Sequence, residues 1–159
     1  MQAASIDRAD RHLLLALSQR GRASNVELAQ AMHLSASAVA RRQRALEDAG
    51  VIRGYGADID PAAFGFSTTV VVQITLKSQR EADLREFEQA VQHCDSVLRC
   101  FLMSGSEDYL LLLLVRDLVD FERVHKTQLS RLPHIARLQS SFALRDVVRR
   151  ALPADLLTQ

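Results

Sequence analysis

The chain has 159 residues, 48% of them hydrophobic and 25% charged, and a formal net charge of +1. This length suits one domain or two small ones, and the composition excludes intrinsic disorder as the main state. The longest wholly apolar run, 109–115, is far shorter than the roughly 20 residues of a membrane-spanning helix. Residues 1–10 do not resemble a secretory signal, so we expect a cytoplasmic protein without a membrane segment.

Two helices are expected at the start of the chain. Apolar residues at helical spacing predict an amphipathic helix over 6–19. Ser24 and Glu27 have the spacing of a capping box, in which each side chain accepts a hydrogen bond from the other residue's backbone N–H. A second helix is therefore expected from this point through Met32.

A third helix is expected directly afterwards. Ser35 is a candidate N-cap, and Gly50 follows the last expected helical residue, Ala49, as a C-terminal cap. The second and third helices thus meet across a tight turn. We predict a helix-turn-helix at about 25–44, inside a winged-helix-like DNA-binding domain over 1–60 that ends in a short linker strand.

The third helix has one buried face and one basic face. On a helical wheel Val39, Gln43 and Leu46 share one side, and arginines and serines lie opposite. Such a stripe is often only a solvated surface, but the preceding capped helix and tight turn favour a recognition helix that contacts phosphates and bases in the major groove. The candidate DNA contacts are Ser35, Ser37, Arg41, Arg42 and Arg44. Arg42 lies nearer the buried edge, so a structural role is equally consistent with its position.

The pattern changes after Pro61. The expected elements are strands over 66–77, 97–103, 109–115 and 135–148 and helices over 81–94 and 118–132. Their order, βαββαβ, is that of a ferredoxin-like fold, in which a four-stranded antiparallel sheet carries both helices on one face. We therefore predict an α+β protein whose second domain, 61–159, is ferredoxin-like.

The predicted sheet is apolar on both faces. The strand over 109–115 has no polar alternation, although the two helices cover only one side. An uncovered apolar face marks an interaction site, so we expect this domain to pair with a second copy. The alternative is that the N-terminal helices fold back over the face.

The sequence offers no support for catalysis or metal binding. Cys94 and Cys100 are expected to be reduced, buried hydrophobic residues. The five histidines are scattered without the spacing of zinc ligands, and neither a nucleophile elbow nor a phosphate-binding glycine loop is present. We assign no catalytic residue, metal or cofactor, and we expect that the protein is not an enzyme.

The combined architecture resembles the Lrp/AsnC family of feast/famine transcription regulators. The segments that carry the resemblance are 24–29, 34–35, 50–55, Ser104-Gly105 and Asp108-Tyr109. The resemblance covers nearly the whole chain. It implies a sequence-specific DNA-binding regulator that assembles through its C-terminal domains into dimers and often octamers, and that is tuned by a small effector such as an amino acid.

The resemblance also places an effector site at the glycine turn between the second and third strands. The corresponding residues are Gly105, Ser106, Glu107 and Asp108. Glycine lets the backbone approach an α-carboxylate, and Asp108 has the charge to bind an α-ammonium. The alternative is an ordinary hairpin turn, in which Gly105 adopts a positive φ and Asp108 caps the backbone.

Two positions depart from the family pattern. Gln43 stands where an apolar residue is usual on the buried side of the recognition helix, so its amide needs a hydrogen-bond partner. His33 stands in the turn, where glycine is common, so we expect a positive φ at this histidine.

Two other functions are compatible with this architecture. Siroheme decarboxylases resemble it, but their His-Asn-Tyr-x-Arg stretch is absent from the corresponding strand, 99–103, which contains neither histidine nor tyrosine. A ligand-binding oligomeric module that no longer binds DNA is the other alternative. Loss of the arginine stripe would be typical of that module, whereas this chain retains it.

Overall fold

The computed structural model describes residues 6–150 and 153 and divides into two compact units. The division falls between Ile59 and Asp60. Residues 148–150, expected in the second domain, group with the first unit, where an Arg149 NH2 group donates to Asp58 Oδ1 at 3.0 Å. The remaining ends of the two expected domains lie outside the described residues.

The first unit is built from α1 (Arg8–Gln19), α2 (Asn25–Met32) and α3 (Ala36–Asp48). The first helix begins after Asp7, whose side chain accepts a hydrogen bond from the Asp10 backbone N–H at 2.8 Å. The capping box expected at the start of α2 is confirmed, and the Ser35 hydroxyl caps α3. The helix-turn-helix therefore follows from its cap residues.

The turn between α2 and α3 is closed by a left-handed residue. His33 has a φ of 54°, which confirms the positive value expected at this position. With the turn closed, the three helices share one small core, formed by Leu13, Leu28, Ala29, Val39 and Leu46.

The linker strand expected before residue 60 is absent from the described chain. Residues 53–60 form neither helix nor strand. A β-strand is defined by hydrogen bonds to a neighbouring strand, and the single chain supplies none to this segment. The expectation was wrong because a sequence that favours an extended backbone does not by itself supply a neighbouring strand for hydrogen bonding.

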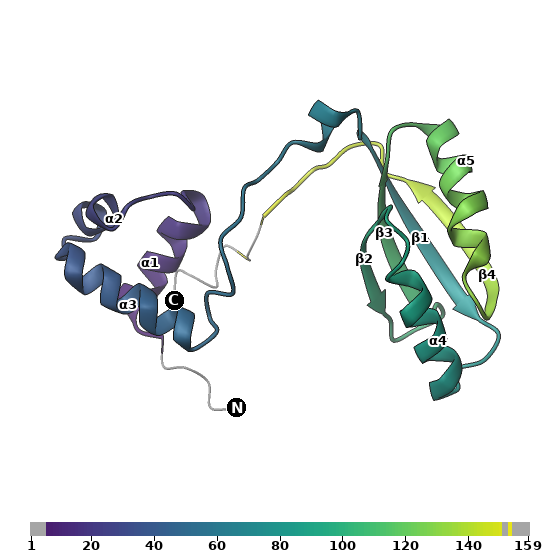
Figure 1. The fold of residues 1–159 in the computed structure, drawn as a ribbon, viewed down its shortest axis with the longest axis horizontal. Helices are drawn as coiled ribbons and strands as arrows, with labels where there is room; N and C mark the ends of the chain where they lie inside the picture. The colour runs from purple at the N-terminus through teal and green to yellow at the C-terminus, as the bar shows by residue number, and fades with distance from the viewer. Residues whose placement is uncertain (1–5, 151–152, 154–159) are drawn as a thin grey trace. The chain divides into compact units, whose positions relative to one another are not determined.

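The second unit has the expected βαββαβ order and ferredoxin-like fold. Its elements are η1 (Pro61–Phe64), β1 (Thr68–Leu76), α4 (Glu81–Val91), β2 (Val97–Leu102), β3 (Tyr109–Val115), α5 (Leu118–Thr127), η2 (Leu129–Arg131) and β4 (Ile135–Phe142). The four strands form one antiparallel sheet in the order β2-β3-β1-β4 (Figure 1). The two central strands are therefore β1 and β3, and β2 and β4 are the edge strands.

The two faces of the sheet differ, as expected. Alternate residues of β3 are buried, and the core on that side includes Phe87 of α4 and Val124 of α5, so both helices cover the same face. The opposite face carries apolar side chains that none of the described helices of this unit covers. We call this surface the open sheet face and define it as Val71, Phe101, Leu110, Leu112 and Leu114.

Several element ends differ from the sequence expectation. The last strand stops at Phe142, the last residue paired with β1, and a strand that continued to 148 would run past the start of β1 at Thr68. The helix α4 ends at Val91, and α5 ends at Thr127 before the short η2 turn. Sequence periodicity continues through these turns, which is why the helices were predicted too long.

The two cysteines differ in exposure. Cys94 is buried, as expected, but Cys100 is exposed. Cys100 lies on β2, an edge strand, where fewer side chains cover it than in the centre of the sheet. Desolvation by the nearby protein atoms, with a smaller effect from Glu88, raises the pKa of the Cys100 thiol to about 11. The thiol is therefore protonated at neutral pH.

Within residues 6–150 and 153, no helix combines the length and apolar character needed to cross a membrane.

Candidate nucleic-acid interface and effector site

The outer face of α3 presents the predicted polar stripe. Ser35, Ser37, Arg41 and Arg44 are all exposed. The Ser35 hydroxyl lies 3.1 Å from that of Ser37 and also accepts a hydrogen bond from the Ala38 N–H, so this end of the stripe is fixed. Neither Arg41 nor Arg44 forms an ion pair with another described residue. Both guanidinium groups are consequently available to an anionic partner.

Arg42 behaves differently from its neighbours. Its NH1 group donates to Asp7 Oδ2 at 2.7 Å and to Asp10 Oδ1 at 2.8 Å. These hydrogen bonds, the one to Asp10 first, raise the pKa of Arg42. Arg42 therefore joins α3 to the capping box of α1, which is the structural role of the two that the sequence allowed.

Gln43 finds its partners on the inner side of α3. Its Nε2 donates to the Tyr55 hydroxyl at 2.7 Å and to Glu47 Oε1 at 3.3 Å. The Tyr55 hydroxyl in turn donates to Glu47 Oε1 at 2.7 Å. The sequence indicated that Gln43 needs a partner but not which one, because Tyr55 lies beyond the end of the helix.

The glycine turn between β2 and β3 is exposed at its tip. Gly105 has a φ of 157°, a conformation that residues with side chains rarely adopt. The Ser106 hydroxyl donates to Glu107 Oε2 at 2.6 Å. Glu107 is half-buried, whereas Gly105 and Ser106 are exposed.

Asp108 is buried beneath this turn. Its carboxylate accepts hydrogen bonds from the Leu76 N–H at 2.7 Å and from Gln79 Nε2 at 2.6 Å, one on each oxygen. The structure thus places Asp108 in the backbone-capping role, the second of its two expected roles. Gln79 was missed by the sequence analysis, since it lies 29 residues away and in a loop with no periodic pattern.

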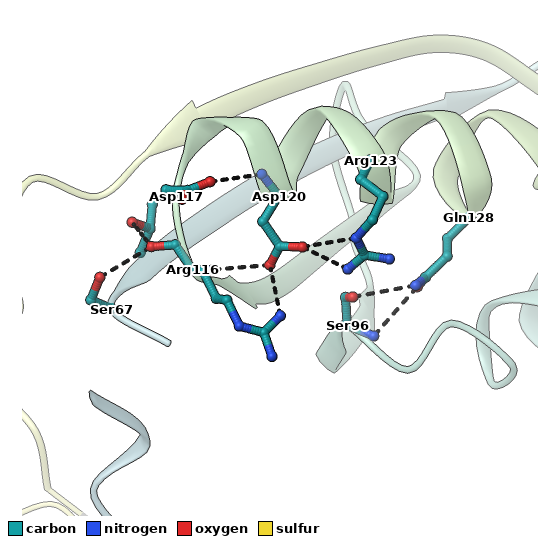
Figure 2. A network of polar contacts seen from close by, with 8 residues as sticks. Ser67, Ser96, Arg116, Asp117, Asp120, Arg123 and Gln128 are labelled. Atoms are coloured by element: carbon teal, nitrogen blue, oxygen red, sulfur yellow. Dashed lines mark hydrogen bonds and ion pairs between the residues drawn. The ribbon is translucent and has the colours of Figure 1, made fainter. Parts of the chain in front are cut away.

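A second polar network surrounds the start of α5 (Figure 2). The buried Asp120 carboxylate accepts hydrogen bonds from the Arg116 N–H at 3.0 Å and from Arg123 Nε and NH2 at 2.9 and 2.6 Å. Asp117 caps the helix through the Asp120 N–H. The Arg116 N–H, followed by Arg123, lowers the pKa of Asp120. This network joins the end of β3 to α5, and the Asp117-x-x-Asp120 spacing was its available sequence signal.

The surface of α5 carries a shallow apolar pocket of about 360 Å³, lined by Leu118, Val119, Phe121, Glu122 and His125. Phe121 also contacts Phe142 edge-to-face, with ring centroids 5.1 Å apart. Among the residues that the structure describes, no group of three or more acidic, histidine or cysteine side chains is placed to hold a metal ion.

These features define a class of protein. One unit is a helix-turn-helix with exposed arginines on its recognition helix, and the other is a ferredoxin-like unit with an open sheet face and a glycine turn. A basic helix of this type enters the major groove of DNA. The class is that of the two-domain, helix-turn-helix DNA-binding proteins.

Comparison with known families specifies the class further. The Lrp/AsnC ligand binding domain matches residues 69–153, and a winged helix-turn-helix DNA-binding domain matches residues 6–53. The chain belongs to the Lrp/AsnC family of transcriptional regulators.

Curated relatives and solved structures agree with this assignment. The chain is 35% identical over 150 residues to the Bkd operon transcriptional regulator of Pseudomonas aeruginosa, covering 94% of this chain and 98% of that protein. It is 44% identical over 121 residues to an uncharacterized HTH-type transcriptional regulator of Sinorhizobium fredii, covering 76% of this chain and 95% of that protein. A Neisseria meningitidis transcriptional regulator, solved as an L-Met complex, superimposes with a TM-score of 0.89 at 30% identity, covering 96% of this chain and 99% of that one.

Proposed function

We propose that this regulator binds a specific DNA sequence through α3 and that an amino-acid effector tunes its DNA affinity or assembly. The observation that carries the DNA-binding part is the exposed stripe of α3, opposite the buried Val39 and Leu46. The effector part is supported by two relatives that were solved with L-methionine, the Neisseria protein and a feast or famine regulatory protein of M. tuberculosis. DNA as the partner also favours a cytoplasmic location.

The proposed DNA contacts are Ser35, Ser37, Arg41 and Arg44. Serine hydroxyls near the start of a recognition helix reach phosphates, and an arginine binds guanine with two parallel hydrogen bonds. Arg42 is left out of this set because its guanidinium already bridges two carboxylates of α1.

The proposed effector site is the turn Gly105, Ser106, Glu107 and Asp108. The exposed backbone around Gly105 suits an α-carboxylate, because nothing lies within 4 Å of the position that a Cβ would take there. We assign the α-ammonium to Glu107 rather than to Asp108. Asp108 supports the site indirectly, by holding the turn on Leu76 and Gln79.

We further propose that two copies pair through the open sheet face and that such dimers assemble to an octamer. The support is the apolar character of that face, since burial of apolar surface contributes roughly 25 cal/mol per Å². A twofold dimer would present two α3 helices, as a pseudo-palindromic DNA site requires.

Fluorescence anisotropy tests the proposal with DNA from upstream of the protein's own gene and scrambled DNA as the control. We expect preferential binding that weakens steeply with salt, because phosphate contacts release counterions. We also expect L-methionine, or another amino acid from a defined pool, to change the affinity. Equal affinity for both DNAs would argue against autoregulation, and equal affinity across a genomic operator library would overturn sequence-specific binding.

A further inference from the structure

Tyr55 is tied to the recognition helix by its hydroxyl group. It lies in the segment that follows the helix-turn-helix, between Gly54 and Gly56, and its side chain makes the described contacts with Gln43 and Glu47. Although 52% of the residue is exposed, partial desolvation by nearby protein atoms, followed by the bond to Glu47, raises the pKa of Tyr55. Two hydrogen bonds therefore hold the hydroxyl on α3, although about half of the residue is exposed.

Gln43 depends on this contact. Its Oε1 atom is buried and has no hydrogen-bond partner among the described residues. A buried acceptor without a partner is costly, so the Gln43 amide is held only through its donor side, by the bonds from Nε2 to the Tyr55 hydroxyl at 2.7 Å and to Glu47 Oε1 at 3.3 Å. An apolar residue on this side of α3 would pack without such a requirement. The hydrogen-bonded pair of Gln43 and Tyr55 thus fixes the orientation of α3 rather than adding hydrophobic stabilisation.

Tyr55 and Arg42 fix α3 from two sides. Arg42 holds the helix to α1, and Gln43, the next residue, holds it to Tyr55. The exposed Arg41 and Arg44 flank these two residues in the sequence. A rotation of α3 by about 20° would move groups on its surface, about 5–6 Å from the axis, by about 2 Å. Such a shift exceeds the range over which a hydrogen bond to a base keeps its geometry.

We propose that Tyr55 is a positioning residue for DNA recognition, which sets the rotation of α3 through Gln43 and Glu47. This inference rests on the proposed role of α3 in DNA binding. It also makes the segment 53–60 part of the recognition apparatus, because a change in the path of that segment acts on α3 through one side chain. Tyr55 itself contacts no base in this scheme.

The test is Tyr55→Phe, which removes the hydroxyl and keeps the ring. We expect the affinity for the preferred DNA to fall about tenfold, comparable to one mismatched base pair, with a change below about twofold for scrambled DNA. The salt dependence should be unchanged because the phosphate-binding charges remain. An unchanged ratio of specific to scrambled affinity would overturn the proposal.

Three variants act as controls. Tyr109→Phe also removes a tyrosine–glutamate hydrogen bond, the one to Glu88 in the second unit, and should leave the affinity ratio unchanged. Glu47→Gln keeps an acceptor oxygen and should preserve most of the specificity. The double variant Gln43→Leu/Tyr55→Phe removes the unpaired Gln43 oxygen together with the Tyr55 hydroxyl, so it should keep the wild-type Tm yet show the same loss of specificity. Wild-type specificity in that double variant would contradict the positioning role.

Amide hydrogen exchange without DNA separates this inference from the proposed function. Tyr55→Phe should accelerate amide exchange over 43–48 at the end of α3. Unchanged exchange there would contradict the proposal that Tyr55 holds this helix. If Arg41→Ala and Arg44→Ala keep full DNA affinity, the proposed function of α3 fails, whereas the exchange result still decides whether Tyr55 holds the helix.

Discussion

At the scale of single residues, neighbouring arginines on α3 have opposite tasks. Arg41 and Arg44 are exposed, whereas Arg42 is shared between Asp7 and Asp10. Helical periodicity alone leaves Arg42 between the two faces. The contact with α1 assigns it to the fold, since α1 places its capping carboxylates beside that edge of α3.

Alanine substitutions should separate these tasks. Arg41→Ala and Arg44→Ala should each weaken binding to specific DNA by about 1–3 kcal/mol if they read a base, with an unchanged Tm. Arg42→Ala should instead lower the Tm by roughly a few degrees, because two carboxylates lose their shared cation. Anisotropy and thermal denaturation measure the two effects. A stable Arg42→Ala protein with lost DNA affinity would return Arg42 to the DNA-contact set.

The network around Asp120 predicts that the stability of the fold decreases at low pH. The folded-state pKa of Asp120 is lowered, by the Arg116 N–H first and then by Arg123. The stabilisation that the Asp120 carboxylate contributes is therefore complete above its unfolded-state pKa of about 4. This stabilisation is lost as the pH falls through the folded-state pKa. Asp120→Asn should therefore lower the Tm at pH 7 and flatten the decrease of Tm below about pH 4. Glu122→Gln, at an exposed pair with Lys126, is the control. Parallel Tm profiles for Asp120→Asn and the wild type would rule out this account.

At the scale of elements, adjacent acidic residues in the glycine turn should give different phenotypes. Glu107→Gln removes a charge at the proposed ligand position, so it should abolish the response to L-methionine and leave the Tm unchanged. Asp108→Asn weakens the acceptor for the Leu76 N–H and Gln79, so it should lower the Tm by roughly several degrees. Isothermal titration calorimetry and thermal denaturation distinguish the outcomes. Full methionine binding by Glu107→Gln would exclude that carboxylate from the site.

Most elements were predictable because their causes are local. The capping box of Ser24 and Glu27 and the positive φ of His33 depend only on residues within one helical turn. Contacts made across the chain were not predictable in this way. Asp108 lies 32 residues from Leu76, and Tyr55 reaches back 12 residues to Gln43, so neither partner follows from periodicity. The linker strand failed for the same reason, since its partner had to be known first.

At the scale of the whole molecule, the open sheet face should control assembly. Leu112→Lys places a charge in the middle of this face, so we expect a monomer in sedimentation analysis. Loss of the second recognition helix should weaken operator binding by roughly 100-fold or more. Val119→Lys, at an exposed residue of α5, should keep the dimer. A Leu112→Lys dimer would show that the copies join elsewhere.

The two edge strands of the sheet, β2 and β4, have features that oppose aggregation through strand addition. Both ladders that involve an edge strand contain a register shift, between Val97 and Arg99 on β2 and between Thr75 and Leu76 opposite β4. Each edge strand also carries an exposed arginine, Arg99 or Arg137. Irregular, charged edges discourage the addition of further strands, which is how fibres grow. Contacts between copies are thereby directed away from the strand edges, and a twofold arrangement of two copies closes on itself and stops.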